Sequence, residues 1–354
     1  MEKFRKYFKN KKILLTGHTG FKGSWLTFFL LNCGGKVLGI SKDIPTKPSL
    51  FNILKLKKKI IHKNLDIRNF KELKKIFIKF NPDYVFHLAA QSLVQKSYLH
   101  PIETWTTNLN GTINVLECLK LQKKKSISVI ITSDKTYKNI ETKKGYSEND
   151  MLGGVDPYGA SKSAADIAIT SYINSYFKLK KSNKIIGIAR AGNVIGGGDW
   201  SQDRLIPDCF KKWLKKLTVI IRNPKSTRPW QNIIDIINAY LILAIKLKST
   251  NKLHGEAFNF GPKVKKNFKV IEVLNLIKRY WPNAKWKIKK NKKNFFENSL
   301  LNLNSNKAKS LLKWEAKISF ENNIKLTTEW YKEFSKKTVD MEKFTLNQIN
   351  KIID

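Results

Sequence analysis

The sequence predicts an α/β fold in which a doubly wound parallel sheet carries a second, smaller mixed α/β domain on its C-terminal side. Three observations lead to this prediction. Over about the first 190 of the 354 residues, short apolar runs alternate with segments of helical periodicity. The apolar runs are nearly continuous, which is typical of strands buried on both faces of a parallel sheet. The first run also passes through a glycine-rich turn into a helix, which is the Rossmann arrangement.

The predicted strands follow one another at spacings that leave room for crossover helices. They cover residues 11–17, 36–41, 60–67, 83–90, 126–134 and 184–192. The connecting helices are expected at 24–35, 69–80 and 106–121, and a fourth begins at Asp156-Pro157. Asn69 and Asp156 are suited to cap two of these helices because their side-chain oxygens can accept backbone N–H groups of the first turn. Pro157 fits the first helical position.

The pattern changes after residue 191. The predicted elements there are, in order, a glycine-rich loop at 194–200, a helix at 204–217, a strand at 218–224 and helices at 233–247 and 270–281. We therefore assign residues 1–190 to the sheet domain, which is rejoined by about 233–260. Residues 191–335 form an interleaved second domain, and the polar residues 336–354 are expected to form a peripheral tail.

The net charge of +41 invites the interpretation that the protein binds nucleic acid. Seven of the 68 basic residues are arginines, however, and the rest are lysines spread over most polar segments. A nucleic-acid interface more often gathers both residue types on one face together with aromatic residues. We therefore expect no specific nucleic-acid binding. Each of the few arginines becomes a candidate for binding an anion through its planar fork.

Membrane and metal sites are not expected either. No apolar run approaches the roughly 20 residues that a membrane helix needs. Cys33, Cys118 and Cys209 have no CxxC spacing, and the five histidines show no spacing typical of metal ligands. Unpaired thiols are typical of a reducing compartment. The sequence thus predicts a cytoplasmic protein without a membrane partner and without a metal.

Gly17, Gly20 and Gly23 form a GxxGxxG turn between the first strand and the first helix. Such glycines let the backbone approach a pyrophosphate, which the N-terminus of the helix then stabilises. Asp66, near the end of the third strand, is suited to accept the adenine amino group. The second strand ends at Ser41, where an acidic residue usually binds the adenosine ribose. The turn predicts NAD as the cofactor and leaves NADP open.

A second group of residues points to proton transfer. Tyr158 and Lys162 are four residues apart and so share one face of a helix. A phenol with an ordinary pKa of about 10 is a poor base near neutrality. A nearby ammonium and the positive nicotinamide favour the phenolate and are expected to lower that pKa. Ser133, Asp134 and Lys135 add a hydroxyl, a carboxylate and an ammonium at the end of the fifth strand.

The segments TGHTGFKG, HLAAQ, TSDK, YGASK and RAGNVIGGGDW together resemble the extended short-chain dehydrogenase/reductase family. The resemblance runs from about Lys12 to Tyr331. The segments GHTGFKGSW, RLIPD and RNP…RPWQ are more distinctive, and make the chain similar to the nucleotide-sugar 4,6-dehydratases, in particular to the branch that acts on CDP-glucose. This resemblance implies an NAD-binding Rossmann domain followed by a domain for the nucleotide sugar.

In these dehydratases, the tyrosine corresponding to Tyr158 takes the proton of the sugar C4 hydroxyl while a hydride passes from C4 to NAD. The C4 ketone acidifies the C5 proton, water is eliminated across C5–C6, and the hydride returns to C6. The implied product is CDP-4-dehydro-6-deoxy-D-glucose, and the enzyme is a lyase. Asp134 would be the acid at C6 and Ser133 a hydrogen-bond donor at C4. Lys135 replaces the Glu of the dTDP-glucose branch, which leaves its role open between base and electrostatic stabiliser.

The resemblance also implies which residues contact the ligands. The implied cofactor contacts, besides Tyr158 and Lys162, are Gly17, Thr19, Gly20, Phe21, Lys22, Gly23, Ser41, Asp66, Ile67, Leu88, Ala89, Ala90, Asn108 and Thr132. The implied substrate contacts are Gln91, Asn193, Arg204, Leu205, Arg222 and Arg228. Arg190 is a further candidate for the diphosphate, which favours bidentate donors. Trp200 and Trp230 could stack on the base or the sugar, or pack in the core.

Two other interpretations stay open. The chain could be a dehydratase or an epimerase acting on another nucleotide sugar, such as a GDP- or CDP-linked heptose. It could also be a dinucleotide-binding regulator without catalysis, although such a protein has no need of Ser133, Asp134, Tyr158 and Lys162. Enzymes of the family usually associate through two long helices, here around 108–121 and 158–177, which implies a homodimer or a homotetramer.

Overall fold

The computed structural model describes residues 1–142, 144–179, 182–262, 267–289 and 300–353. Within these residues, a seven-stranded parallel sheet has the strand order β11-β6-β5-β4-β1-β2-β3. The strands are β1 (Lys12–Thr16), β2 (Lys36–Ser41), β3 (Ile61–Asn64), β4 (Tyr84–His87), β5 (Ser126–Ile131), β6 (Lys184–Ala191) and β11 (Ala257–Phe260). The chain runs from β1 outward to β3 and then crosses to β4 and the other edge. This is the doubly wound topology predicted from the sequence.

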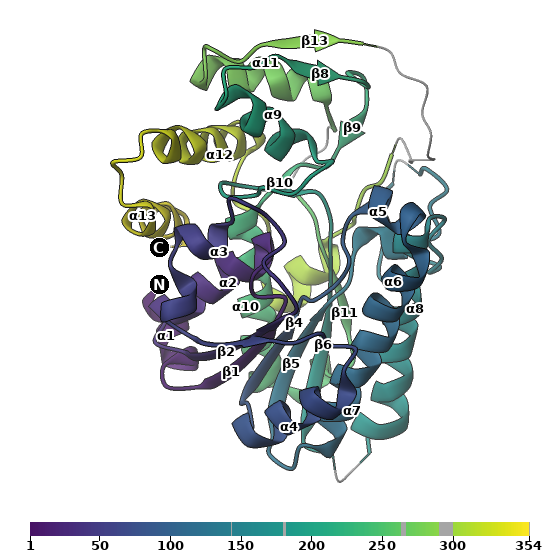
Figure 1. The fold of residues 1–354 in the computed structure, drawn as a ribbon. Helices are drawn as coiled ribbons and strands as arrows, with labels where there is room; N and C mark the ends of the chain where they lie inside the picture. The colour runs from purple at the N-terminus through teal and green to yellow at the C-terminus, as the bar shows by residue number, and fades with distance from the viewer. Residues whose placement is uncertain (143, 180–181, 263–266, 290–299, 354) are drawn as a thin grey trace.

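Helices cover both faces of this sheet (Figure 1). On one face lie α1 (Glu2–Phe8), α2 (Phe21–Asn32) and α10 (Ile233–Ser249), and on the other lie α4 (Phe70–Phe80), α7 (Gly111–Leu121) and α8 (Pro157–Tyr172). Successive residues of a strand point to opposite faces. In β1, Ile13 and Leu15 therefore belong to the first core and Leu14 to the second. This double burial explains the continuous apolar runs of the sequence.

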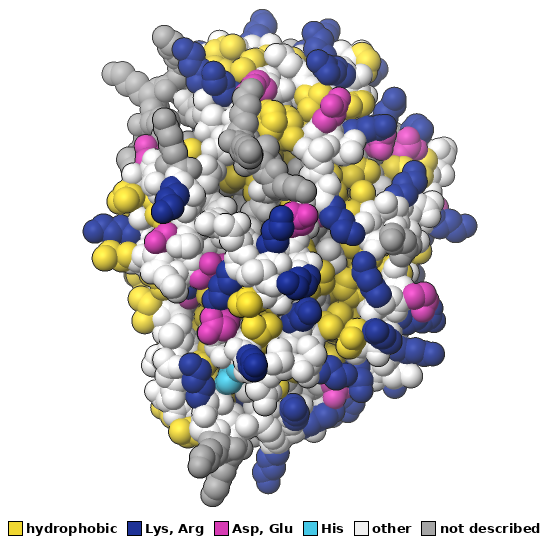
Figure 2. Space-filling view, turned by 180° about the vertical axis from the view of Figure 1, so that it is seen from behind, with side chains coloured by type: hydrophobic (Ala, Val, Ile, Leu, Met, Phe, Trp, Pro, Cys, Tyr) yellow, Lys and Arg dark blue, Asp and Glu magenta, His cyan; other side chains and the backbone are white. Residues whose placement is uncertain are grey.

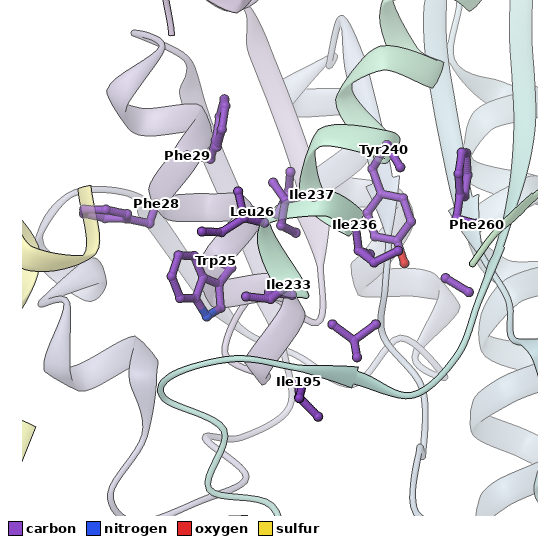
Figure 3. Packing of buried hydrophobic residues seen from close by; sticks show 14 of the residues in the cluster. Trp25, Leu26, Phe28, Phe29, Ile195, Ile233, Ile236, Ile237, Tyr240 and Phe260 are labelled. Atoms are coloured by element: carbon purple, nitrogen blue, oxygen red, sulfur yellow. The ribbon is translucent and has the colours of Figure 1, made fainter. Parts of the chain in front are cut away.

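Large side chains fill the core between α2 and α10 (Figure 3). Trp25 and Leu26 of α2 are buried beside Ile233 and Ile237 of α10. The Trp25 indole N–H also donates to the carbonyl oxygen of Gly197 at 3.0 Å. Because α2 begins at the glycine loop, this packing fixes the loop relative to the sheet.

Both predicted helix caps are present. Asn69 Oδ1 accepts the Glu72 N–H at 3.2 Å at the start of α4, and Asp156 Oδ1 accepts the Gly159 N–H at 2.9 Å at the start of α8. Pro157 occupies the first turn of α8, as predicted. The cap on α8 holds the turn that contains Tyr158 in a defined helical geometry.

Some local elements differ from the sequence prediction. The pattern does not predict α1 or α3 (Leu50–Ile53), because segments of seven and four residues are too short to show a helical period. The helix expected from residue 106 begins earlier, since α5 (Val94–Leu99), α6 (Pro101–Trp105) and a π-helical segment (Thr106–Asn110) precede α7. Strand β3 has four residues, fewer than the eight expected.

A second region lies beyond the carboxyl ends of the strands (Figure 1). Its helices are α9 (Leu205–Trp213), α11 (Val270–Tyr280) and α12 (Phe320–Ser335). Three short ladders join β7 (Val194–Ile195) to β10 (Gln231–Asn232), β8 (Val219–Ile221) to β13 (Trp286–Ile288), and β9 (Thr227–Arg228) to β12 (Phe268–Lys269). Between these segments, α10 and β11 return to the main sheet. The domain boundaries drawn from the sequence stay a prediction.

The last helix, α13 (Met341–Ile353), packs against the fold. Ile349 and Ile353 are buried in the same core as α2 and α10, and the Trp330 indole N–H donates to Thr345 Oγ1 at 3.0 Å. The sequence analysis placed residues 336–354 at the periphery because of their polar composition. The apolar residues of α13 nevertheless share one face, and that face is buried.

Positive charge is spread over the surface. Figure 2 shows lysine and arginine side chains across the face in view, with acidic and apolar side chains between them. Across the ranges that the structure describes, no helix combines the length and the apolar composition needed to cross a bilayer.

Candidate active site

The glycine loop between β1 and α2 contacts the end of β4. Gly17 has a left-handed φ of +76°, and its N–H donates to the carbonyl oxygen of Ile40 at 2.8 Å. A Cβ on Gly17 would lie 2.7 Å from the Ala89 nitrogen, and a Cβ on Gly23 would lie 2.1 Å from the Gly17 oxygen. The packing of the chain itself therefore requires glycine at both positions.

Gly20 is not required by packing in this way. A Cβ there would come no closer than 3.4 Å to the Gly17 oxygen, which is close to an ordinary contact, and its φ is −71°. Gly20 caps α2, and the N–H groups of the following turn, from Phe21 to Gly23, have no partner within the helix. The packing of the chain thus does not explain the glycine at position 20. A ligand that lies against the backbone and accepts these N–H groups would explain it. The loop thus fits the pyrophosphate of a dinucleotide such as NAD.

Ser41, at the end of β2, belongs to an uncharged network. Ser41 Oγ lies 3.0 Å from His18 Nδ1, and His18 Nε2 lies 2.7 Å from His62 Nδ1. Burial lowers the pKa of His18 to about 4, so this imidazole is neutral near pH 7. The N–H of Thr19 also points to Ser41 Oγ at 3.4 Å. The sequence analysis identified Ser41 but missed the two histidines, which meet because β1 pairs with β2 and β2 pairs with β3.

The charged residues near the ends of β2 and β3 are paired within the chain. Arg68 donates to both oxygens of Asp66, with Nη2 2.6 Å from Oδ2 and Nε 3.1 Å from Oδ1. Lys42 Nζ lies 2.8 Å from Glu103 Oε1. Asp66 keeps acceptor capacity for a ligand, because each carboxylate oxygen has two lone pairs. Ile67 is buried beside it.

Amide groups hold the loop after β4. The Gln91 N–H donates to Asn108 Oδ1 at 2.8 Å, and Asn108 Nδ2 donates to Gln91 O at 3.0 Å and Ser161 Oγ at 2.9 Å. The predicted ligand contacts Gln91 and Asn108 therefore build the wall of the site through bonds within the chain. Half-buried beside the glycine loop lie Leu88, Ala89 and Ala90.

Ser133 links the groups at the end of β5. Its hydroxyl donates to Asp134 Oδ1 at 3.0 Å and accepts the Lys135 N–H at 3.2 Å, and its interaction with the Tyr158 phenol favours a lower pKa of that phenol. Asp134 is buried, and Asn193 Nδ2 lies 3.5 Å from its Oδ2. The structure therefore brings a hydroxyl, a carboxylate and a phenol from two elements into one region, where the hydroxyl donates to the carboxylate.

Lys135 points toward the start of α8. Its Nζ lies 4.0 Å from Oδ2 of Asp156, whose other oxygen caps the helix. A carboxylate at this distance attracts the ammonium. Of the two roles that the sequence left open for Lys135, this geometry favours the electrostatic one. Asp156 was identified in the sequence only as a helix cap.

Tyr158 and Lys162 are one turn apart on α8, and burial shifts the pKa values of both side chains. Burial raises the pKa of Tyr158 to about 12, the interaction with Ser133 opposes this rise, and the negative charge of Asp134 adds to it. Burial lowers the pKa of Lys162 to about 8, and its Nζ donates to the Ile131 oxygen at 3.0 Å. Within the chain, desolvation outweighs the effects of Ser133 and Arg204, which act to lower the pKa of Tyr158. The expected lowering includes the charge of the nicotinamide and stays a prediction.

Lys22 and Arg204 bring positive charge to the same region. Burial lowers the pKa of Lys22 to about 8, the Arg204 cation lowers it further, and the carboxylates of Asp134 and Asp199 act in the opposite direction. Arg204 Nη1 lies 3.3 Å from Asp199 Oδ2, and its Nη2 lies 3.4 Å from Ser92 Oγ. Lys22 was expected to contact only the cofactor. Its electrostatic interaction with Asp134 connects the glycine loop to the group at the end of β5.

Arg190 does not face the site. Its guanidinium donates to Asp166, with Nη2 2.7 Å from Oδ1 and Nε 2.9 Å from Oδ2, and only 5% of its side chain is exposed. Asp166 Oδ2 also accepts the Thr132 hydroxyl at 3.0 Å. The interpretation of Arg190 as a diphosphate ligand is therefore wrong, because its fork is already occupied. Thr132 likewise supports the strand end through this pair.

The remaining substrate candidates lie in the second region. Arg222 follows β8 and is exposed, Arg228 is half-buried on β9, and Leu205 begins α9. Trp200 and Trp230 are both buried. The Trp200 ring packs against Tyr331 at a centroid distance of 5.2 Å, and the Trp230 indole donates to Phe268 O at 3.2 Å. These two tryptophans are core residues, so the structure contradicts their stacking on a base or a sugar.

The sequence analysis missed two residues that lie next to the site. Gly192 lies directly against Asp134, and Gln231 bonds to the Gly192 oxygen. Both occur in segments that carried the resemblance, RAGNVIGGGDW and RPWQ, but no spacing relates them. Within the described ranges, no group of three or more His, Cys, Asp or Glu side chains could hold a metal ion.

A dinucleotide loop after the first strand and a tyrosine–lysine pair near the end of the fifth occur together in the short-chain dehydrogenase/reductases, the class to which fold and site point. Within that class, the chain belongs to the family described as GDP-mannose 4,6 dehydratase, whose model matches residues 14–327. This confirms the family resemblance noted in the sequence.

Individual relatives agree with this assignment. The chain is 38% identical over 333 residues to a CDP-glucose 4,6-dehydratase of Salmonella typhimurium, covering 93% of this chain and 92% of that protein. It is 25% identical to a dTDP-glucose 4,6-dehydratase of Haemophilus influenzae, covering 90% and 97%. Among solved structures, the epimerase Mth375 of Methanothermobacter thermautotrophicus matches with a TM-score of 0.80 and 26% identity over 96% of this chain and 97% of that one.

Proposed function

We propose that this chain dehydrates CDP-D-glucose to CDP-4-dehydro-6-deoxy-D-glucose with NAD as a cofactor that is regenerated in each turnover. The observation that carries the proposal is the group at the end of β5, where the Ser133 hydroxyl donates to Asp134 Oδ1 at 3.0 Å and the Tyr158 phenol interacts electrostatically with both residues. The relative of 38% identity, itself a CDP-glucose 4,6-dehydratase, supports the choice of substrate.

The residues divide the reaction between them. Tyr158 takes the proton of the C4 hydroxyl, and the interaction with Ser133 favours the phenolate form that can accept this proton. Held at the glycine loop, NAD would supply the hydride acceptor for C4 and, once reduced, the hydride donor for C6. Asp134, in its protonated form, gives its proton to the departing C6 hydroxyl, which leaves as water. A water molecule takes the C5 proton and returns it to C5 when the hydride adds to C6. Lys135, drawn to Asp156, supplies a positive charge for the enolate that forms in between.

Cofactor binding follows from the backbone of the loop. Gly20 and the N–H groups that follow it receive the pyrophosphate, and Lys22 adds a positive charge between the phosphates and Asp134. The neutral His18–Ser41 network suits an unmodified ribose hydroxyl better than a second phosphate, which supports NAD over NADP. On the substrate side, we assign the diphosphate to Arg204, Arg222 and Arg228.

We also propose that copies of this chain associate through the helical face formed by α5, α6 and α8. Exposed apolar side chains gather there, with Leu99, Ile102 and Ile167 at 66%, 79% and 57% exposure. Residues of α7 are mostly buried, so α8 and the helices preceding α7 offer the larger apolar surface. We expect a homodimer or homotetramer, and light scattering that finds only monomer would contradict this. A cytoplasmic location is part of the proposal and is supported by three free, buried cysteines.

Mass spectrometry tests the function directly. The protein is incubated with NAD and, in separate reactions, with CDP-glucose and with UDP-, dTDP- and GDP-linked sugars. Loss of one water from CDP-glucose alone, without net change in the redox state of the cofactor, is the expected result. Loss of water from CDP-glucose must also disappear in Tyr158→Phe, which keeps the ring but lacks the proton-accepting oxygen.

An alternative activity is a dehydratase or an epimerase that acts on another nucleotide sugar. The family model, named for GDP-mannose 4,6 dehydratase, and a CDP-paratose 2-epimerase of Salmonella typhi at 26% identity favour testing it. Loss of water from a different nucleotide sugar would keep the mechanism and replace the substrate. Inversion of a sugar carbon without loss of water would replace the reaction as well.

A further inference from the structure

The carboxylate of the acid Asp134 packs against a turn at Gly192, which has no side chain to separate the two. A Cβ on Gly192 would lie 1.8 Å from Asp134 Oδ2 and 2.4 Å from Oδ1, so the carboxyl group lies directly on the backbone of Gly192. The next residue, Asn193, has a left-handed φ of +43°, and its amide lies 3.5 Å from Oδ2. The position of the acid therefore depends on a strained two-residue turn.

A non-glycine residue at positive φ persists only when its surroundings hold it there. Gln231 provides that support. Its N–H donates to the Asn193 oxygen at 3.3 Å, and its side-chain Nε2 donates both to the Gly192 oxygen and to the Phe260 oxygen at 3.1 Å. Gln231 is 3% exposed and begins β10, whereas Phe260 ends β11. One buried carboxamide thus ties the turn after β6 to the neighbouring strand of the sheet.

We infer that Gln231 is a positioning residue for Asp134, acting through the Gly192–Asn193 turn. This inference rests on the proposed function, in which Asp134 protonates the C6 hydroxyl. An acid must lie within hydrogen-bond reach of the atom that it protonates. Gln231 touches neither the substrate nor the cofactor in this assignment. Its loss affects the elimination of water more than substrate binding.

The chain contains a matched control for this residue. Gln122 is also buried, at 5% exposure, and its Nε2 donates to the Pro82 oxygen at 2.8 Å and to Asn81 Oδ1 at 3.1 Å. In both glutamines the side-chain Oε1 has no partner among the described residues. Gln122 directly follows α7 and lies before the amino ends of β4 and β5, at the opposite edge of the sheet from Asp134. Gln231→Leu and Gln122→Leu therefore remove the same kind of bonds from two distant places.

The test compares wild type, Gln231→Leu and Gln122→Leu with the nucleotide sugar that wild type dehydrates. A displacement of the acid by about 1 Å is expected to lower kcat roughly 10- to 100-fold in Gln231→Leu, with KM changed less than about twofold. Quenched single turnovers should accumulate the 4-keto sugar that still carries its C6 hydroxyl. Gln122→Leu should match wild type in both measurements. Equal kinetics and equal intermediate levels in the two variants would overturn the inference.

Crystal structures of both variants supply a readout that needs no activity. In Gln231→Leu, Asn193 should leave the left-handed region and the Asp134 carboxylate should move, whereas neither should change in Gln122→Leu. An unmoved Asp134 in Gln231→Leu would overturn the inference even if the wild type is an active dehydratase. Conversely, a wild type that dehydrates no nucleotide sugar would remove the proposed function, and the movement of Asp134 would still decide whether Gln231 positions it.

Discussion

Replacing Arg190 tests whether this arginine stabilises the fold by pairing with Asp166 or binds the diphosphate of the substrate. Its guanidinium and the Asp166 carboxylate form a bidentate pair, at 2.7 Å and 2.9 Å, with side-chain exposures of 5% and 0%. Arg190→Met fills a similar volume but leaves Asp166 buried without a counter-charge. Breaking a buried pair from one side costs about 3–5 kcal/mol of the free energy of unfolding. Arg279→Met, at a side chain that is 73% exposed, is the control and should cost less than about 0.5 kcal/mol.

Denaturant unfolding of the two variants measures this difference. The double variant Arg190→Met/Asp166→Leu also removes the unpaired Asp166 carboxylate and should recover much of the lost free energy of unfolding. A buried ion pair can be replaced by apolar side chains of similar volume at little cost. The reasoning would be refuted by an Arg190→Met variant that unfolds like wild type but has a raised KM for the nucleotide sugar. That outcome would mean that Arg190 binds the diphosphate after all.

Three further predictions follow from single contacts. Gly20→Ala should fold normally but lose NAD affinity in calorimetric titration, whereas Gly23→Ala should destabilise the fold, because its Cβ would lie 2.1 Å from Gly17 O. Equal stability of the two variants would contradict this. Lys162 has a pKa lowered by burial from 10.5 to about 8, so stability increases as pH rises through this interval. Lys162→Met should be inactive, because the ammonium near Tyr158 is lost. Its free energy of unfolding should nevertheless be up to about 3 kcal/mol higher than that of wild type at pH 7, and this gain should vanish above pH about 10. Truncation after Asp340 removes the buried face of α13 and should lower Tm, and an unchanged Tm would show that the helix is dispensable.

Much of the fold was predictable because its signals are local. Alternating apolar runs and helical segments gave the strands and helices of the doubly wound sheet, and Asn69 and Asp156 were identified as caps from their position before a helical pattern. Short elements such as α3, of four residues, have too few residues to show a period. The burial of α13 was missed because a polar composition hides the single face on which its apolar residues recur.

The candidate site was predictable only where its residues are close in sequence. The glycine loop, the run from Ser133 to Lys135 and the pair Tyr158 and Lys162 all have fixed spacings, and each spacing has a chemical reason. The role of a residue that depends on its burial and on its neighbours in the fold was harder to predict from the sequence. The phenol of Tyr158 has its pKa raised to about 12 by burial, which no spacing reports.

The sequence by itself determined the class of fold, the loop suited to a dinucleotide and the groups available for proton transfer, because backbone geometry and residue type decide these locally. Only the tertiary structure decided which groups meet. Arg190 and Asp166 are 24 residues apart and Gln231 and Gly192 are 39 apart, yet each pair is joined by buried hydrogen bonds. A buried polar group must find a partner wherever the fold brings one within reach, and that partner sets its role.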